Sequence, residues 1–200
     1  MSGRLAVRSQ LPHVETGGIL DDCGPASVAC AVSWVIGSEV SAADGIAAKK
    51  RATGAPDRQG VSDNGSTLAQ LAKTAKDLGA RSRYPADWQD AVQAAKDGAA
   101  LVINVQAPFG YPVQALSKWH RNWAKYWSKK DPLTVAAGYG HMVAVACDPV
   151  VGWQLADPTF SGAGAERNAA VVTLQDVRAV AAGKGDAPHK RVLIVERKAQ

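Results

Sequence analysis

Apolar and small residues recur at helical spacing in four segments of the first half of the chain. This pattern predicts helices over 24–36, 41–50, 66–78 and 87–96. Ser66 stands where an N-cap is expected for the third helix, and Gly79 and Gly98 follow the last two helices as stop signals. The segment 51–65 is polar and rich in Gly, Pro and Asp, which is typical of a surface loop. The N-terminal half is therefore expected to be largely helical.

Short runs of β-branched and apolar residues mark the second half, and predict strands over 100–105, 141–147, 153–156 and 191–195. A turn at 148–152 joins the second and third strands into a hairpin. A further helix is predicted over 173–182, because Asp176 completes a capping-box-like start. The segment 107–138 mixes aromatic with basic residues at helical spacing and is expected to be a helical insertion with packed aromatics. Helices followed by an antiparallel sheet that begins at residue 100 predict an α+β fold.

The composition describes one globular domain over 1–200 and no membrane protein. Hydrophobic residues make up 46% and charged residues 20% of the chain, and no apolar run approaches the roughly 20 residues of a membrane span. The first ten residues lack the apolar core of a secretory signal, so the chain is expected to be made and kept in the cytoplasm. A net charge of +5 favours anionic surfaces, such as wall polymers or nucleic acid, without choosing between them.

The cysteines and histidines do not suggest a metal site. Three cysteines are too few for a disulfide framework, and no pair has the spacing of a structural zinc site. Cys30 and Cys147 lie in apolar segments and are assigned to the core, whereas His13, His120 and His189 are assigned to the surface. No metal and no other cofactor is predicted.

Cys23 differs from the other cysteines because it stands at the start of a predicted helix, in the motif DDCGPAS at 21–27. A thiol at the first turn feels the positive end of the helix dipole, which favours the thiolate. His141 opens the strand GHMVAV at 140–145 and could supply the imidazole that a cysteine peptidase needs. The alternative interpretations are a buried structural thiol and a strand histidine with an ordinary partner.

The geometry of the hairpin selects a third residue. A turn near Pro149 would place Asp157 opposite His141, with Cβ atoms about 5 Å apart. Asp148 lies seven residues along the strand, on the order of 20 Å away. We therefore predict a catalytic triad of Cys23, His141 and Asp157, the alternative for Asp157 being a plain Asp-Pro turn residue.

The motifs DCGPAS at a helix start, GHMVAV on a strand and ADP at 156–158 resemble the papain-like cysteine peptidases related to bacteriocin-leader-processing enzymes. The resemblance covers roughly 20–160. Within that group, the Ala-rich and Trp-bearing chain most resembles the N-terminal peptidase domains of endolysins from phages of mycobacteria and related actinobacteria. It implies a papain-like fold, with the catalytic cysteine at the N-terminus of a helix packed on an antiparallel sheet.

The chain departs from this group at the oxyanion hole. The group commonly has a glutamine about six residues before the cysteine, where this chain has Gly17. Gln10 is the only upstream glutamine and is a candidate donor beside the backbone N–H of Cys23. A second donor is not identified by the sequence.

These observations lead to the hypothesis of a cysteine endopeptidase that hydrolyses amide bonds in the peptide part of peptidoglycan, as the catalytic module of a phage endolysin. Its partners would be the peptidoglycan peptide and wall-binding or glycan-cleaving modules of a longer chain, with no nucleic acid and no membrane insertion. It would stay in the host cytoplasm until the membrane is permeabilised and then reach the cell wall. Two alternatives stay open: a leader-peptide or protein-processing peptidase of the same fold, and a non-catalytic papain-like binding domain.

Overall fold

A computed structural model of the chain describes residues 5–6, 23–53, 66–107, 139–158, 169–182 and 187–198. The helices are α2 (Cys23–Ile36), α3 (Ala42–Thr53), α4 (Leu68–Asp77), α5 (Trp88–Lys96), α8 (Leu174–Ala182) and the 3-10 turn η3 (Pro188–Arg191). The strands are β1 (Ala80–Arg83), β2 (Ala100–Ala107), β3 (Tyr139–Asp148), β4 (Gly152–Ala156), β5 (Ala170–Val172) and β6 (Val192–Arg197). The predicted insertion lies outside the described residues from residue 108 onwards.

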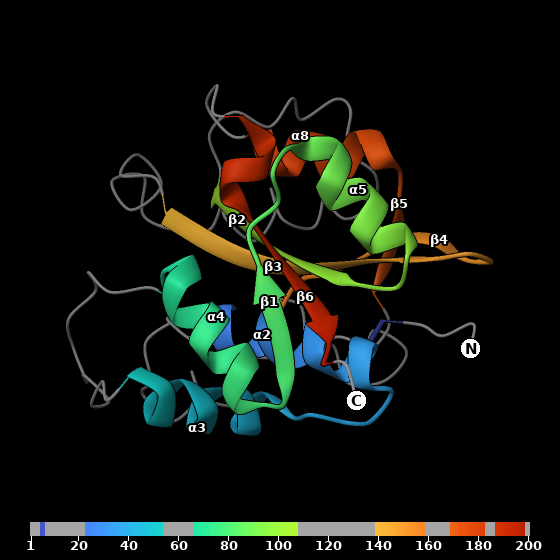
Figure 1. The fold of residues 1–200 in the computed structure, drawn as a ribbon. Helices are drawn as coiled ribbons and strands as arrows, with labels where there is room; N and C mark the ends of the chain where they lie inside the picture. Colours follow the sequence, from blue (N-terminus) through green and yellow to red (C-terminus); the bar gives the residue numbers. More distant parts are fainter. Residues whose placement is uncertain are drawn as a thin grey trace, which may run out of the picture.

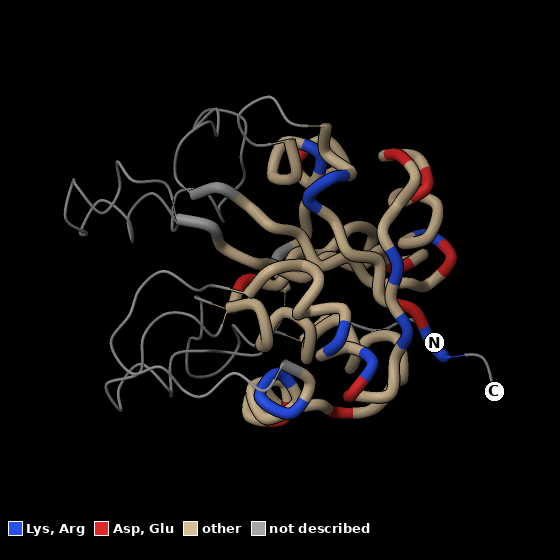
Figure 2. Tube along the Cα trace, turned by 60° about the vertical axis from the view of Figure 1, so that its left-hand side comes forward, with Lys and Arg blue, Asp and Glu red and all other residues tan. Residues whose placement is uncertain are grey.

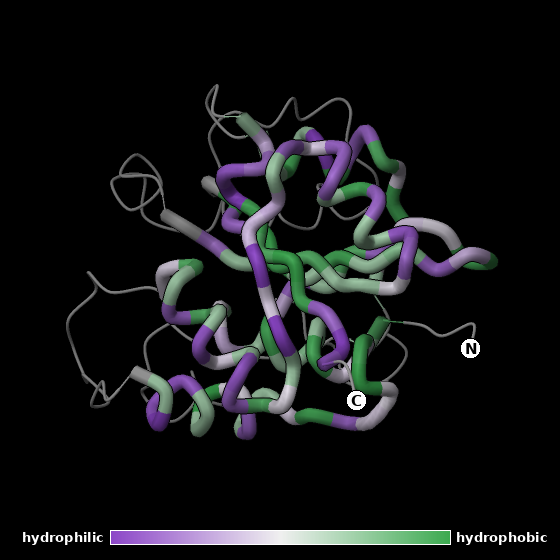
Figure 3. Tube along the Cα trace, viewed as in Figure 1, coloured by the Kyte–Doolittle hydropathy of each residue, from purple (hydrophilic) through white to green (hydrophobic). Residues whose placement is uncertain are grey.

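The strands form one six-stranded sheet in the order β1-β6-β2-β3-β4-β5, with every neighbouring pair antiparallel. Helices α2, α3 and α4 lie on one side of this sheet, and α5 and α8 lie on the other (Figure 1). Figure 3 shows that hydrophobic residues gather along the central strands. The sheet therefore separates two hydrophobic cores.

Side-chain alternation along the central strands supplies both cores. Leu101 and Ile103 of β2 pack with α5 and α8, whereas Val102 packs with α2 and α4 on the other face. Eleven of the 14 residues of α2 are buried, because the helix is enclosed between the sheet and α4. Its many small residues allow this close packing.

All the predicted helices and strands in the described ranges are present, with ends shifted by a few residues. The prediction that Ser66 caps α4 is wrong, since Thr67 is the N-cap. Its hydroxyl accepts the N–H of Gln70, and the Gln70 side chain accepts the N–H of Thr67. The predicted start of α8 is confirmed, because Thr173 and Asp176 exchange the same two hydrogen bonds.

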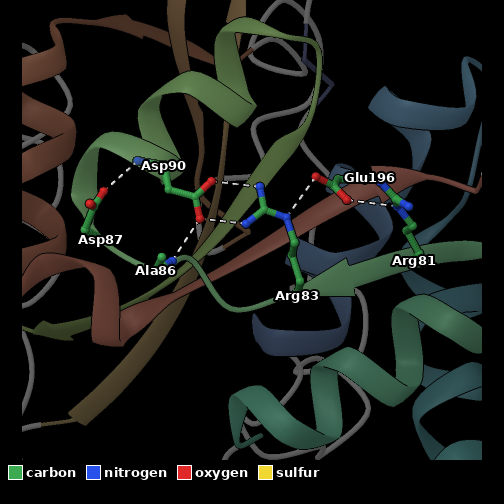
Figure 4. Close-up of polar contacts among 6 residues, drawn as sticks. All are labelled: Arg81, Arg83, Ala86, Asp87, Asp90 and Glu196. Carbon is green, nitrogen blue, oxygen red and sulfur yellow. Dashed lines mark hydrogen bonds and ion pairs between the residues drawn. The ribbon is translucent and has the colours of Figure 1, made fainter.

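The prediction that the sheet begins at residue 100 is also wrong. The edge strand β1 precedes it and has the sequence ARSR, in which no apolar run marks a strand. Its two arginines hold it to β6 through Glu196, and Arg83 also forms a bidentate ion pair with Asp90 of α5 (Figure 4). The other edge strand, β5, has only three residues, too few for a pattern that predicts a strand.

Candidate active site

Cys23 is the first residue of α2 and is 5% exposed. The first turn of α2 contains no acidic side chain, so no carboxylate of that turn offsets the positive end of the helix dipole. Cys23 therefore lies where the sequence motif predicts it, at the positive end of the α2 dipole.

The helix turn that carries Cys23 is held by two close approaches of neighbouring helices. A Cβ atom on Gly24 would lie 2.8 Å from both Cβ and Oγ of Ser66 and 3.0 Å from Leu71 Cδ2. A Cβ atom on Gly45 of α3 would fall on the carbonyl oxygen of Pro25. A side chain at Gly45 would require a shift of the backbone, and one at Gly24 would displace the side chains of Ser66 and Leu71. Both α3 and the chain leading into α4 therefore pack directly on the first turn of α2.

His141 on β3 and Asp157 directly after β4 form a buried pair. The ring Nε2 of His141 lies 2.7 Å from Oδ1 of Asp157. The two residues are 5% and 2% exposed. Because Asp157 occupies Nε2, the nitrogen left for the Cys23 thiol is Nδ1.

The register of the hairpin differs from the predicted one. Ala144 pairs with Ala156 and Asp148 with Gly152, so continuing the register would place Asp157 opposite Val143 instead of His141. Asp157 therefore reaches His141 diagonally across the hairpin, a separation that a side chain can span. The shift of two residues keeps both side chains on the same face, which explains why the contact forms despite the wrong register.

The rival carboxylate, Asp148, explains the position of the turn. Its Oδ1 accepts the backbone N–H groups of Val150 and Val151, both at 2.8 Å. Gly152 then closes the turn with a φ of +88°, a value that favours glycine. The Asp148 carboxylate thus stabilises the far end of the hairpin.

The charges around His141 favour its protonated form. Burial is the largest single effect and lowers the pKa, but the charge and hydrogen bond of Asp157, with a hydrogen bond and charge from Cys23, outweigh it. Together they raise the pKa of His141 to about 10. His141 is therefore held as an imidazolium at neutral pH.

Cys30 and Cys147 have other surroundings. Cys30 is 1% exposed and its thiol donates to the carbonyl oxygen of Ala6 at 2.8 Å, while Cys147 is only partly buried. Burial raises the pKa of the Cys147 thiol. His189 lies partly exposed on η3, whereas Gln10, Gly17, His13 and His120 lie outside the described residues.

Metal and membrane features are absent from the described ranges. They contain no group of three or more His, Cys, Asp or Glu side chains that could hold a metal ion. Among the helices of these same ranges, none is long and apolar enough to cross a membrane.

The architecture matches a solved structure over nearly its whole length. A crystal structure from Bacillus anthracis, described as that of a C39-like peptidase, has a TM-score of 0.52 and 12% sequence identity to this chain. The match covers 98% of this chain and 96% of that one. The fold is that of a C39-like peptidase. No protein-family model and no curated protein matches the sequence.

The match confirms the predicted architecture as a mixture of helices with an antiparallel sheet. Within it, Cys23, His141 and Asp157 come together from α2, β3 and the end of β4. Their catalytic roles remain predictions.

Sequence reasoning missed the contact of Ser66 with Gly24, because it assigned Ser66 to capping α4. The three-residue spacing of Thr67 and Gln70 fits a capping box. This spacing could have identified Thr67, and not Ser66, as the N-cap of α4.

Proposed function

We propose that the protein is a cysteine peptidase in which Cys23 is the nucleophile, His141 the general acid and base, and Asp157 the residue that orients the imidazole. The observation that carries the proposal is the buried contact of 2.7 Å between His141 and Asp157, on a ring that also interacts with the thiol at the start of α2. A nucleophile, a base and an orienting carboxylate are the groups required for acyl transfer through a thioester.

In the proposed reaction, the Cys23 thiolate attacks the carbonyl carbon of the scissile amide, and the carbonyl π electrons move to oxygen. The C–N bond then breaks, and the leaving nitrogen takes the proton from Nδ1 of His141, so that a neutral amine departs. A water molecule adds to the thioester and gives a proton to the neutral imidazole. Breaking the C–S bond releases the carboxylic acid and restores the thiolate and imidazolium. Asp157 orients the imidazole ring and stabilises the imidazolium.

We propose the peptide part of bacterial peptidoglycan as the substrate, in the role of an endolysin module. The Ala-rich, Trp-bearing composition of the chain supports this choice by its resemblance to actinobacteriophage endolysin domains, whereas the motifs around Cys23, His141 and Asp157 support the peptidase class alone. The net charge of +5 would favour approach to anionic wall polymers. In Figure 2, Lys and Arg residues lie at several separate places on the described surface, so the charge supports general attraction better than one binding patch.

The test is incubation of purified actinobacterial peptidoglycan with the wild-type chain and with Cys23→Ala under reducing conditions, followed by mass spectrometry of the released fragments. New amino termini from the wild type alone would support a thiol peptidase and identify the bond. Fragments from both proteins would exclude Cys23 as the nucleophile.

Adding casein to this experiment as a second substrate separates the two alternatives. A protein-processing peptidase would cleave an unfolded protein such as casein in a Cys23-dependent way and leave peptidoglycan intact. A non-catalytic domain would sediment with peptidoglycan and cleave neither substrate.

A further inference from the structure

Ser66 has a buried hydroxyl for which the fold shows no structural use. The residue is 6% exposed, and within the described part of the chain its Oγ has no hydrogen-bond partner. Capping of α4 does not require it, because Thr67 performs that role. Buried polar groups are nearly always bonded, so an unpartnered hydroxyl on a residue that is not wholly enclosed points to a partner that is absent from the free protein.

The position of Ser66 connects this hydroxyl to the site. Its Cβ and Oγ atoms both lie 2.8 Å from the point that a Cβ on Gly24 would occupy, so the hydroxyl packs against the residue after Cys23. The first turn of a helix presents unpaired backbone N–H groups, which together form an anion site. Pro25 has no N–H, so the first turn of α2 offers one donor fewer than usual.

The proposed peptidase reaction needs donors at this end of α2. Attack by the thiolate places a negative charge on the carbonyl oxygen, and the backbone N–H of Cys23 can donate to it. The glutamine that commonly supplies the second donor is replaced by Gly17 in the sequence.

We infer that the Ser66 hydroxyl is the second oxyanion donor of this site, acting beside the backbone N–H of Cys23. The inference rests on the proposed peptidase function. During attack the hydroxyl donates a hydrogen bond to the carbonyl oxygen as its charge develops. When the C–N bond breaks, the C=O bond reforms and the hydrogen bond weakens. Ser66 neither gains nor loses a proton in these steps.

The test compares Ser66→Ala with Ser27→Ala in three assays. Ser27 lies one turn further into α2, is 0% exposed, and its hydroxyl also has no partner among the described residues. It is therefore a matched control for loss of a buried hydroxyl close to Cys23. The assays are hydrolysis of a soluble cross-linked stem peptide, binding of a short alanyl aldehyde, and alkylation of Cys23 by iodoacetamide.

The three assays separate an oxyanion donor from a structural residue. Hydrolysis and aldehyde binding both place a tetrahedral carbon with a polarised oxygen at the helix terminus, since the thiol adds across the aldehyde carbonyl with no leaving group. Alkylation displaces iodide from a CH₂ group and requires only a reactive thiolate. For Ser66→Ala we expect kcat to fall about 100-fold with little change in KM, a comparable weakening of aldehyde binding, and an unchanged alkylation rate across pH. For Ser27→Ala we expect no change in any of the three.

Three results would overturn the inference. Equal kcat and aldehyde affinity in the wild type and Ser66→Ala would show that the hydroxyl is not a donor. A parallel loss of alkylation in Ser66→Ala would show that the residue only maintains the fold around Cys23. A wild type that is alkylated but neither hydrolyses the peptide nor binds the aldehyde would refute the proposed function itself, and the oxyanion site with it.

Discussion

Replacing Asp157 by asparagine would isolate the effect of one buried charge on His141. The amide oxygen of the new side chain can still accept from Nε2, so the ring keeps its orientation while the negative charge is lost. The pKa of about 10 is a net value in which burial already acts against the imidazolium. Removing the charge of Asp157 leaves only the interactions with Cys23 to oppose burial, so the pKa of His141 should fall well below 10, towards its ordinary value of 6.5.

The pKa shift of His141 sets an upper bound on the free energy by which the folded protein favours the imidazolium. A difference of three to four units corresponds to about 5 kcal/mol, taken as an upper bound for the preference for the imidazolium. Because the folded pKa is raised, protonation of His141 adds stability that is complete below about pH 6.5 and is lost as the pH rises towards 10. Asp157→Asn should lack this contribution, and its unfolding free energy should fall short of the wild type most clearly at acidic to neutral pH.

The same argument predicts the pH profile of hydrolysis. The wild type should keep its activity through pH 8 and lose it near pH 10, where the imidazolium loses its proton. In Asp157→Asn the alkaline limb should move to lower pH, by at most about three pH units, so that activity at pH 8 falls relative to the wild type. The measurements are kcat/KM against pH, and NMR titration of the His141 ring protons in both proteins.

Asp148→Asn is the matched control, because it makes the same exchange in the same hairpin and its amide oxygen can still accept from Val150 and Val151. It should leave the titration of His141 unchanged. If the alkaline limb and the ring titration of Asp157→Asn coincide with those of the wild type, the argument that Asp157 holds the proton on His141 is refuted.

Two further predictions concern the scaffold. Gly45→Ala should destabilise the chain by about 2 kcal/mol in urea denaturation, because the methyl group would overlap the Pro25 carbonyl. An unchanged denaturation midpoint would contradict the close packing of α3 on the first turn of α2. Asp90→Asn should cost under about 1 kcal/mol at neutral pH, since its ion pair with Arg83 is partly exposed. The pKa of Asp90 is lowered to about 2, first by the Arg83 hydrogen bonds, so this contribution should disappear between pH 4 and pH 2 and weaken in high salt. A stability difference that is independent of both pH and salt would argue against this ion pair.

Much of the fold could be predicted from local patterns. The periodicity of apolar residues located α2, α4 and α5, because an amphipathic or buried helix needs such spacing wherever it packs. The edge strands β1 and β5 could not be found in this way. Each is short and stabilised by backbone pairing with a neighbouring strand, and β1 also by the ion pairs of its arginines with Glu196, which is distant in the sequence.

The hairpin illustrates where local reasoning reaches its limit. The sequence predicts a turn near Pro149, but Asp148 bonds the next two N–H groups and centres the turn one residue later. This changes the register by two positions. Side chains alternate with a period of two, so His141 and Asp157 stay on one face and the contact forms diagonally.

By itself, the sequence determined which residues could carry the chemistry: a thiol at a helix start, a histidine opening a strand and a carboxylate after a hairpin, since these features depend on short spacings. Only the tertiary structure decided that the thiol and the imidazole meet, because α2 and β3 are far apart in the chain and are brought together by burial of α2 against the sheet. The tertiary structure also placed the Ser66 hydroxyl against Gly24. That contact depends on the packing of α4 on α2, and no local pattern encodes a contact between elements that are distant in sequence.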